Sequence, residues 1–303
     1  MMRKLYVCLL ALLSYCTMHA QLLWKISGGG LAEPSYVLGT FHLAPGNYVD
    51  SIAGFHDAFA QIRQVCGEVD MEEMMKPETL QHVQEAMFLP EGVTLQNLLD
   101  KEEMNALNQF AMDLMGVDFS NPLVGPQLSR MLPAALTTDF SVMMYKKYNP
   151  QFTPDNGIDN YVQRLGKEKG YAVVGLESID EQVEVLFKSQ TLERQKELLM
   201  CMVHHRDYEE MATEELVKAY YAQDLSRIEA LGDEHFDDGC DTTDEEKEML
   251  LDHRNLRWVE KMPAIMQAPT LFAVGAAHLT GDKGLVTLLR DAGYEVAAVS
   301  TTP

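Results

Sequence analysis

Apolar and polar residues are arranged along the chain in patterns that predict two similar segments, one near each end. Near the start, the apolar runs LLWKIS (residues 22–27) and SYVLGTFH (residues 35–42) flank a glycine-rich stretch, which predicts a β-hairpin. Apolar residues then recur at helical spacing between Ile52 and Ile62, and the short run QVCGEVD follows at residues 64–70. Strand, helix and strand in this order predict a β-α-β unit.

The end of the chain repeats this order of elements. Residues 249–262 (MLLDHRNLRWVEKM) and 281–293 (GDKGLVTLLRDAG) have helical patterns, whereas residues 270–278 (TLFAVGAAH) and 294–300 (YEVAAVS) are β-prone. The last three of these segments form a second β-α-β unit. We therefore expect an α/β fold, with one central mixed β-sheet built from duplicated β-α-β units at the two ends of the chain.

The middle of the chain is predicted to be mainly helical. Residues 71–165 are rich in methionine and are interrupted by proline, glycine and asparagine, which separate helices without marking a domain boundary. We expect a single domain over residues 21–303, with these residues as a helical insertion. A third short strand is expected at Ala172–Leu176, followed by helices to about Met211 and an acidic loop at residues 232–248. The methionines are interpreted as core residues, and a methionine-lined peptide groove is the alternative.

The first twenty residues have the pattern of a secretory signal peptide. Arg3 and Lys4 provide positive charge, Leu5–Tyr15 an apolar stretch, and Ala20 a small residue for cleavage. The apolar stretch is shorter than the roughly 20 residues that span a bilayer, and no later stretch approaches that length. A lipoprotein signal ending at Cys16 is disfavoured because a bulky tyrosine precedes it. We expect an exported protein, periplasmic or extracellular, without a transmembrane segment after signal removal.

Charge and cysteine content narrow the classes of partner. Removal of Arg3 and Lys4 leaves 22 basic residues against 46 acidic ones, which changes the formal charge from −22 to −24. We expect no nucleic-acid partner, because phosphate binding requires clustered basic residues. Cys66, Cys201 and Cys240 remain, an odd number without CxxC spacing, so no disulfide framework is indicated. If one bridge forms in an oxidising compartment, we expect it between Cys201 and Cys240.

A short motif, Gly-x-x-His-Leu, occurs twice, at Gly39–Leu43 and at Gly275–Leu279. Each copy ends a predicted strand and precedes a predicted helix. Ligands of open α/β sheets collect beyond the carboxyl ends of the strands, so we expect His42 and His278 to lie at such a site. The glycine of each motif permits a tight turn or a close approach of the backbone to a neighbour.

Two carboxylates are expected near the two histidines, because Glu68 and Glu177 also follow predicted strands. Two histidines and one carboxylate suit Zn²⁺, Mn²⁺, Co²⁺ or Fe²⁺, and a spare carboxylate can take a proton from bound water, as in metal-assisted hydrolysis. Arg254, on the helix before the second motif, is expected either to stabilise an oxyanion or to pair with a metal-binding carboxylate. Hydrogen-bonding roles for the histidines and an exposed Arg254 are the alternatives.

These residues together resemble the TraB/GumN family, whose animal relatives are the Tiki proteases. The resemblance covers nearly all of residues 22–300. It depends on the two opening strands, on GEVD (67–70), GIDNYV (157–162), VVGLESIDEQ (173–182) and HRNLRW (253–258), and on the long block from Phe272 to Val296. It implies a fold related to erythromycin-esterase-like and ChaN-like proteins.

The resemblance also implies an activity, because Tiki-like members are associated with Mn²⁺- or Co²⁺-dependent peptide cleavage. It assigns metal binding to His42, Glu68 and His278, and catalytic roles to Glu68, Glu177 and Arg254, with Zn²⁺ as a further candidate ion. We expect an exported metallopeptidase that cleaves peptide or protein substrates with a metal-activated water. The alternatives are a non-catalytic protein of the cell envelope that binds a peptide or a metal-bearing ligand such as haem, and a hydrolase of small esters or lactones.

Overall fold

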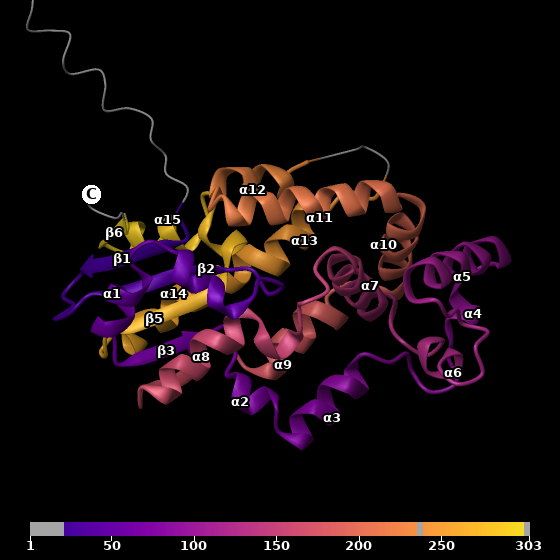
Figure 1. Cartoon of the computed structure of the whole chain (residues 1–303), viewed down its shortest axis with the longest axis horizontal. Coiled ribbons are helices and arrows are strands. Elements are labelled where there is room, and N and C mark those ends of the chain that lie inside the picture. Colours follow the sequence, from indigo (N-terminus) through magenta and orange to yellow (C-terminus); the bar gives the residue numbers. More distant parts are fainter. Residues whose placement is uncertain (1–20, 235–238, 300–303) are drawn as a thin grey trace, which may run out of the picture.

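The computed structural model describes residues 21–234 and 239–299. The signal peptide expected at residues 1–20 lies outside the described residues. Figure 1 shows a β-sheet with helices packed around it in one part of the molecule and a group of helices that extends away from it. Within the described ranges, every helix is either too short or too polar for a transmembrane span.

Six strands form one mixed sheet, which confirms the predicted α/β class. The strand order is β4-β3-β5-β2-β1-β6. β1 is antiparallel to both of its neighbours, whereas the other neighbouring pairs are parallel. The strands are β1 (Leu23–Gly28), β2 (Ser35–Thr40), β3 (Gln64–Gly67), β4 (Ala172–Gly175), β5 (Thr270–Gly275) and β6 (Tyr294–Ala298).

The two ends of the chain interlock in this sheet. β5 lies between β2 and β3, so that Phe272 has Val37 as its partner on one side and Cys66 on the other. α1 (Phe55–Gln61) connects β2 to β3, and α15 (Leu285–Asp291) connects β5 to β6. Each chain end therefore forms a parallel β-α-β crossover. The crossover from β2 to β3 encloses β5, and the crossover from β5 to β6 encloses β2 and β1.

Helices cover both faces of the sheet because alternate strand residues point to opposite sides. On one face, Leu38 belongs to a buried cluster with side chains of α1 and α8 (Ile158–Glu168). On the other face, Val37 packs with side chains of α14 (His253–Ile265) and α15. The result is a three-layer arrangement in which the sheet is buried on both sides.

A second core holds the helical part together. Its buried side chains are mostly leucine, phenylalanine and methionine from residues 89–144 and 183–202, so this part is assembled from two stretches of chain. The interpretation of the methionines in residues 71–165 as core is confirmed for Met131 and Met144, which are buried within it. It is wrong for Met75, Met112 and Met143, which are exposed. Its helices are α2 (Met71–Met74), α3 (Pro77–Ala86), α4 (Leu95–Leu98), α5 (Lys101–Met115), α6 (Gly125–Leu128), α7 (Pro133–Tyr148), α9 (Ile179–Val183) and α10 (Leu192–His204).

The chain returns to the sheet through α11 (Arg206–Tyr221) and α12 (Leu225–Gly232). The helices predicted to end near Met211 thus continue to Gly232, because Tyr220 and Ile228 pack against the sheet. The loop predicted at residues 232–248 is also partly wrong. Its last residues form α13 (Asp244–Lys247), which runs through a π-helical segment, η4 (Glu248–Asp252), directly into α14.

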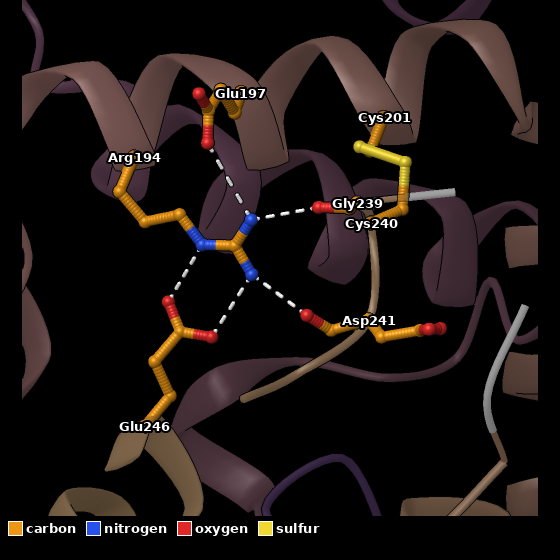
Figure 2. Close-up of a disulfide and its surroundings, with 7 residues drawn as sticks. All are labelled: Arg194, Glu197, Cys201, Gly239, Cys240, Asp241 and Glu246. Carbon is orange, nitrogen blue, oxygen red and sulfur yellow. Dashed lines mark hydrogen bonds and ion pairs between the residues drawn. A yellow bond between two sulfur atoms is a disulfide. The ribbon is translucent and has the colours of Figure 1, made fainter. Parts of the chain in front are cut away.

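A disulfide joins Cys201 of α10 to Cys240, which confirms the expected pairing, and Cys66 is buried and free. Figure 2 shows the guanidinium of Arg194 beside this bond. It donates to the main-chain carbonyls on both sides of Cys240 and, through two nitrogens, to the carboxylate of Glu246. One covalent bond and one partly buried cation therefore hold the segment before α13 against α10.

Candidate functional site

The two Gly-x-x-His-Leu motifs lie side by side because their strands are neighbours. β2 and β5 pair in parallel and end together, with Thr40 opposite Gly275. His42 follows β2 in a turn, and His278 lies in a 3-10 turn, η5 (Ala276–Leu279), after β5. Both strands end two or three residues earlier than predicted, because the small or apolar residues before each histidine fit a tight turn as well as a strand.

Both motif glycines allow a close approach. A Cβ at position 39 would lie 3.0 Å from the Leu279 side chain and 3.2 Å from Ala276, so the first glycine packs directly against the turn of the second motif. Gly275 donates its N–H to Oε1 of Glu68 at 2.8 Å, and a Cβ there would lie 3.4 Å from the same oxygen. The glycines thus bring the two motifs and one carboxylate together.

Arg254 lies at the centre of a buried network of charges. Its Nη2 donates to Oε2 of Glu68 and Oε1 of Glu177, both at 2.6 Å, and its Nε donates to Oε2 of Glu177 at 3.1 Å. Its Nη1 lies 3.0 Å from Nε2 of His278 and donates to the carbonyl of Leu250 at 3.1 Å. These contacts use all five N–H groups of the guanidinium.

The contacts of Arg254 decide between the roles expected for it and show what Glu177 does. Arg254 is only 6% exposed, so the alternative of an exposed arginine is wrong. It pairs with carboxylates, and an oxyanion would require the release of one of its existing bonds. The Glu177 side chain is fully buried behind Arg254 and also accepts a hydrogen bond from Nε1 of Trp258. Glu177 therefore holds the guanidinium in place.

His278 is buried, and Asn255 fixes its tautomer. Nδ2 of Asn255 donates to the main-chain carbonyls of His278 at 3.3 Å and Lys283 at 2.9 Å. The amide oxygen therefore faces Nδ1 of His278, 2.7 Å away, and Nδ1 carries the hydrogen. Nε2 is left as the nitrogen with the lone pair. Burial lowers the pKa of His278 to about 3, so the ring is neutral at neutral pH.

His42 lies at the mouth of the same site, with its side chain 65% exposed. Its Nδ1 is 2.8 Å from Oδ2 of Asp159, whose other oxygen accepts a hydrogen bond from the Thr40 hydroxyl. The charge of Asp159 raises the pKa of His42 to about 9. A metal ion would therefore have to displace a proton from this ring, because only an unprotonated nitrogen is a ligand.

Glu68 is ionised over the whole neutral range. Burial alone would raise its pKa, but electrostatic interactions with His278, His42 and Arg254, together with the N–H of Gly275, lower it to about 2. Both carboxylate oxygens are held, one by Gly275 and one by Arg254. The carboxylate thus has a fixed position and is charged at neutral pH.

These groups line one cavity of about 240 Å³. Its polar lining includes His42, Glu68, Arg254 and His278, and its apolar lining includes Phe41, Leu216, Tyr220, Ile228 and Leu251. Of the site residues predicted from sequence, four therefore meet at the cavity. Glu177 touches it indirectly, through its bonds to Arg254.

The donor set has the chemistry of a metal site, although the described residues include no group of three histidine, cysteine, aspartate or glutamate side chains arranged to hold an ion. Nε2 of His278 and Oε1 of Glu68 are 3.9 Å apart, and the guanidinium of Arg254 lies against both residues. An oxygen holds Nδ1 of each histidine, so each Nε2 can carry a lone pair, and such oxygen partners are typical of metal-binding histidines. An ion at Nε2 of His278 would have to displace the contact of this atom with Nη1 of Arg254. We conclude that His42, Glu68 and His278 fit a divalent ion in donor type.

Comparison with known proteins places the chain in the family that its motifs resemble. Residues 22–298 match the model of the TraB/PrgY/gumN family. The chain belongs to this family. It is also similar to Metalloprotease TIKI2 of Danio rerio, with 24% identity over 90% of this chain and 60% of the relative, so it spans about 60% of that protein's length. No solved structure matches the chain.

In this member of the TraB/PrgY/gumN family, the sequence did not reveal the partners of the two histidines. The patterns at the strand ends single out neither Asp159 nor Asn255. A signal for both was present, because each lies in a sequence block that carries the family resemblance, GIDNYV and HRNLRW. Asp159 and Asn255 share one feature, which is that each is a polar residue in the first turn of its helix.

Proposed function

We propose that this protein is a metal-dependent hydrolase that cleaves peptide substrates at the cavity lined by His42, Glu68 and His278. The observation that carries the proposal is the meeting of two histidines, from opposite ends of the chain, with the Glu68 carboxylate at one cavity. Membership of the TraB/PrgY/gumN family and the similarity to a protein named as a metalloprotease support it.

Three side chains of this cavity would hold the ion. They are His42 and His278, each through Nε2, and Glu68, through its carboxylate. Mn²⁺ and Co²⁺ are the favoured ions, and Zn²⁺ suits the same donors. A bound ion supplies a Lewis acid that polarises a carbonyl and lowers the pKa of a bound water.

The remaining polar residues orient these three. Asp159 and Asn255 hold Nδ1 of the two rings, so that each imidazole presents Nε2. Arg254 and the Gly275 amide hold the two oxygens of Glu68. Because Glu68 lines the cavity and Glu177 lies behind Arg254, we assign contact with water or substrate to Glu68 and orientation of Arg254 to Glu177.

We propose that the protein is exported and acts in the periplasm or outside the cell. The disulfide between Cys201 and Cys240 supports an oxidising compartment. The sequence pattern of residues 1–20 supports export by a signal peptide. Its substrate would be a peptide or protein that reaches the same compartment.

Metal analysis and a peptide library test the proposal together. We expect wild-type protein purified without chelators to contain about one equivalent of a transition metal and to cleave peptides, and His278→Ala to lack both properties. His56→Ala, which changes an exposed histidine on α1, is the matched control and should behave as wild type. Equal cleavage by wild type and His278→Ala would remove the proposal. Ester and lactone substrates in the same assay determine which bond is hydrolysed.

A binding protein is the second candidate. The guanidinium of Arg254 lies against both Glu68 and His278, an arrangement that favours capture of a ligand by the existing charges. Such a protein would hold a peptide or a metal-bearing ligand such as haem without turnover. An intact peptide library together with a co-purified ligand would favour this candidate, and absence of any retained ligand would count against it.

A further inference from the structure

The cavity at the two histidines is small for a peptide substrate. Its volume of about 240 Å³ is below the range of roughly 300–1,000 Å³ that is usual for small-molecule sites. A second cavity of about 570 Å³ adjoins it, and Ile228, Leu251 and Ala277 line both. The two cavities together have the volume that several residues of a peptide require.

The second cavity lies between α12, η4 and the loop that follows the second Gly-x-x-His-Leu motif. Ile228 of α12 and Leu250 and Leu251 of η4 provide an apolar lining. The loop contributes residues 280–283, which come directly after the turn that carries His278. A chain bound across the histidine cavity would therefore continue into this space without leaving the protein surface.

The rim of the second cavity has an excess of negative charge. Its charged residues are Glu229, Asp233, Lys247, Asp252, Asp282 and Lys283. Each lysine is already paired with a rim carboxylate, Lys247 with Asp233 and Lys283 with Asp252. Among the described residues, neither lysine forms a direct ion pair with the other two carboxylates, although the charge of Lys247 also attracts Glu229. Four carboxylates against two lysines leave the rim with a net negative charge.

These two carboxylates, Glu229 and Asp282, come from different elements and line the same cavity. Glu229 belongs to α12, and Asp282 belongs to the loop after the second motif. Gly281 has a φ of +80°, and a Cβ there would lie 3.4 Å from Oε1 of Glu229. The Glu229 carboxylate therefore rests against the residue next to Asp282, and a left-handed glycine permits this contact.

We propose that the second cavity is a substrate subsite that binds a lysine or arginine side chain next to the bond that is cleaved. The apolar lining suits the aliphatic stem of such a side chain, and Glu229 and Asp282 would pair with its charged end. An acidic substrate residue would be repelled by the same two carboxylates. The role as a substrate subsite rests on the proposed peptidase function, whereas the preference for positive charge is measurable without turnover.

Peptide binding in the presence of EDTA tests the charge preference. The probes are three fluorescein-labelled alanine-based octapeptides whose two central residues are lysine, norleucine or glutamate, and the measurement is fluorescence anisotropy. We expect the lysine peptide to bind about tenfold more tightly than the glutamate peptide, which corresponds to about 1.4 kcal/mol. Similar dissociation constants for the three peptides would overturn the proposal.

Charge-removing variants identify the residues responsible. In the double variant Glu229→Gln/Asp282→Asn, we expect the preference for lysine over glutamate to fall below about threefold. Glu91→Gln/Glu102→Gln changes the net charge by the same amount at exposed positions in the helical part and should retain the preference. A preference that persists in the first double variant, with both proteins folded by circular dichroism, would assign it to other residues and overturn the proposal.

Cleavage of the same peptides with added Mn²⁺ separates the subsite from the peptidase function. Equal cleavage of all three peptides would leave the peptidase proposal standing and remove the subsite. Preferential binding of the lysine peptide without cleavage of any peptide would remove the peptidase proposal and retain a site for cationic peptides. If the peptidase proposal and the subsite proposal both hold, we expect preferential cleavage beside lysine, and we expect Glu229→Gln/Asp282→Asn to lose this preference.

Discussion

Replacing Arg254 by methionine removes the cation from the centre of the buried network and keeps an unbranched side chain. Glu68 and Glu177 then both lose their shared partner. Removing one member of a buried ion pair destabilises a protein by about 3–5 kcal/mol, because an uncompensated charge remains in the interior, and two stranded carboxylates place the expected loss near about 5 kcal/mol. With an unfolding entropy of about 2.1 cal/mol/K per residue, a chain of this length would lose about 8 °C in Tm.

The loss of stability in Arg254→Met should also depend on pH. In the wild-type protein, the pKa of Glu68 is lowered from 4.5 to about 2, so its ionised form stabilises the fold above pH 4.5, and this contribution disappears as the pH falls through that interval. In Arg254→Met, loss of the guanidinium raises the pKa of Glu68, so protonation relieves the unpaired charge. We therefore expect the stability difference between wild type and variant to shrink between about pH 7 and pH 5.

Urea unfolding at both pH values, followed by circular dichroism, measures this difference. Arg254→Lys is the matched variant, because it keeps the charge but has three N–H donors and no planar fork, and we expect a smaller loss than with methionine. Arg254→Met/Glu177→Gln removes one stranded charge and should regain about 2 kcal/mol relative to Arg254→Met. The reasoning would be refuted if Arg254→Met lost less than about 1 kcal/mol, or lost the same amount at both pH values.

Three further predictions concern other contacts. Asn255→Leu removes the oxygen that holds Nδ1 of His278, so ¹⁵N NMR of histidine-labelled protein should no longer show a single tautomer and metal affinity should fall about 10–100-fold; an unchanged spectrum contradicts the assigned tautomer. Cys201→Ser/Cys240→Ser opens a loop with a sequence separation of 39 and should lower the free energy of unfolding by about 4 kcal/mol in urea titrations, whereas insensitivity to both mutation and reductant would contradict it. Gly39→Val forces a branched side chain against the turn of the second motif and should lower the free energy of unfolding by about 1–3 kcal/mol, and an unchanged urea midpoint would show that the motifs are not packed this closely.

The strands were predictable from sequence because their side chains follow a local rule. β3 and β5 are short apolar runs bounded by glycine or polar residues, and their bounds in the structure lie within three residues of those expected. The insertion of β5 between β2 and β3 was not predictable, since strand order depends on packing between segments that are far apart in the chain. The sequence did not predict α13, because three acidic residues in a row, Asp244–Glu246, also fit a surface loop.

The sequence was sufficient to predict which residues form the site, but not the hydrogen bonds and ion pairs between them. The positions of His42, Glu68 and His278 follow from the rule that ligands gather at strand ends. The different surroundings of the two histidines do not, because the ring of one is exposed beside Asp159 and the ring of the other is buried beside Asn255. Identical motifs acquire different electrostatics from helices that lie outside the repeat.

The interleaving of the two chain ends has a consequence for biosynthesis. β2 and β3 gain their shared neighbour only when residues 270–275 have left the ribosome, long after β2 and β3 themselves. Until then two apolar strands carry bare edges of the kind that promotes aggregation, and pairing across so long a stretch of chain is slow. A premature stop codon shortly before Thr270 would therefore yield an insoluble product, and a holding chaperone would benefit the intact chain until its last strands arrive.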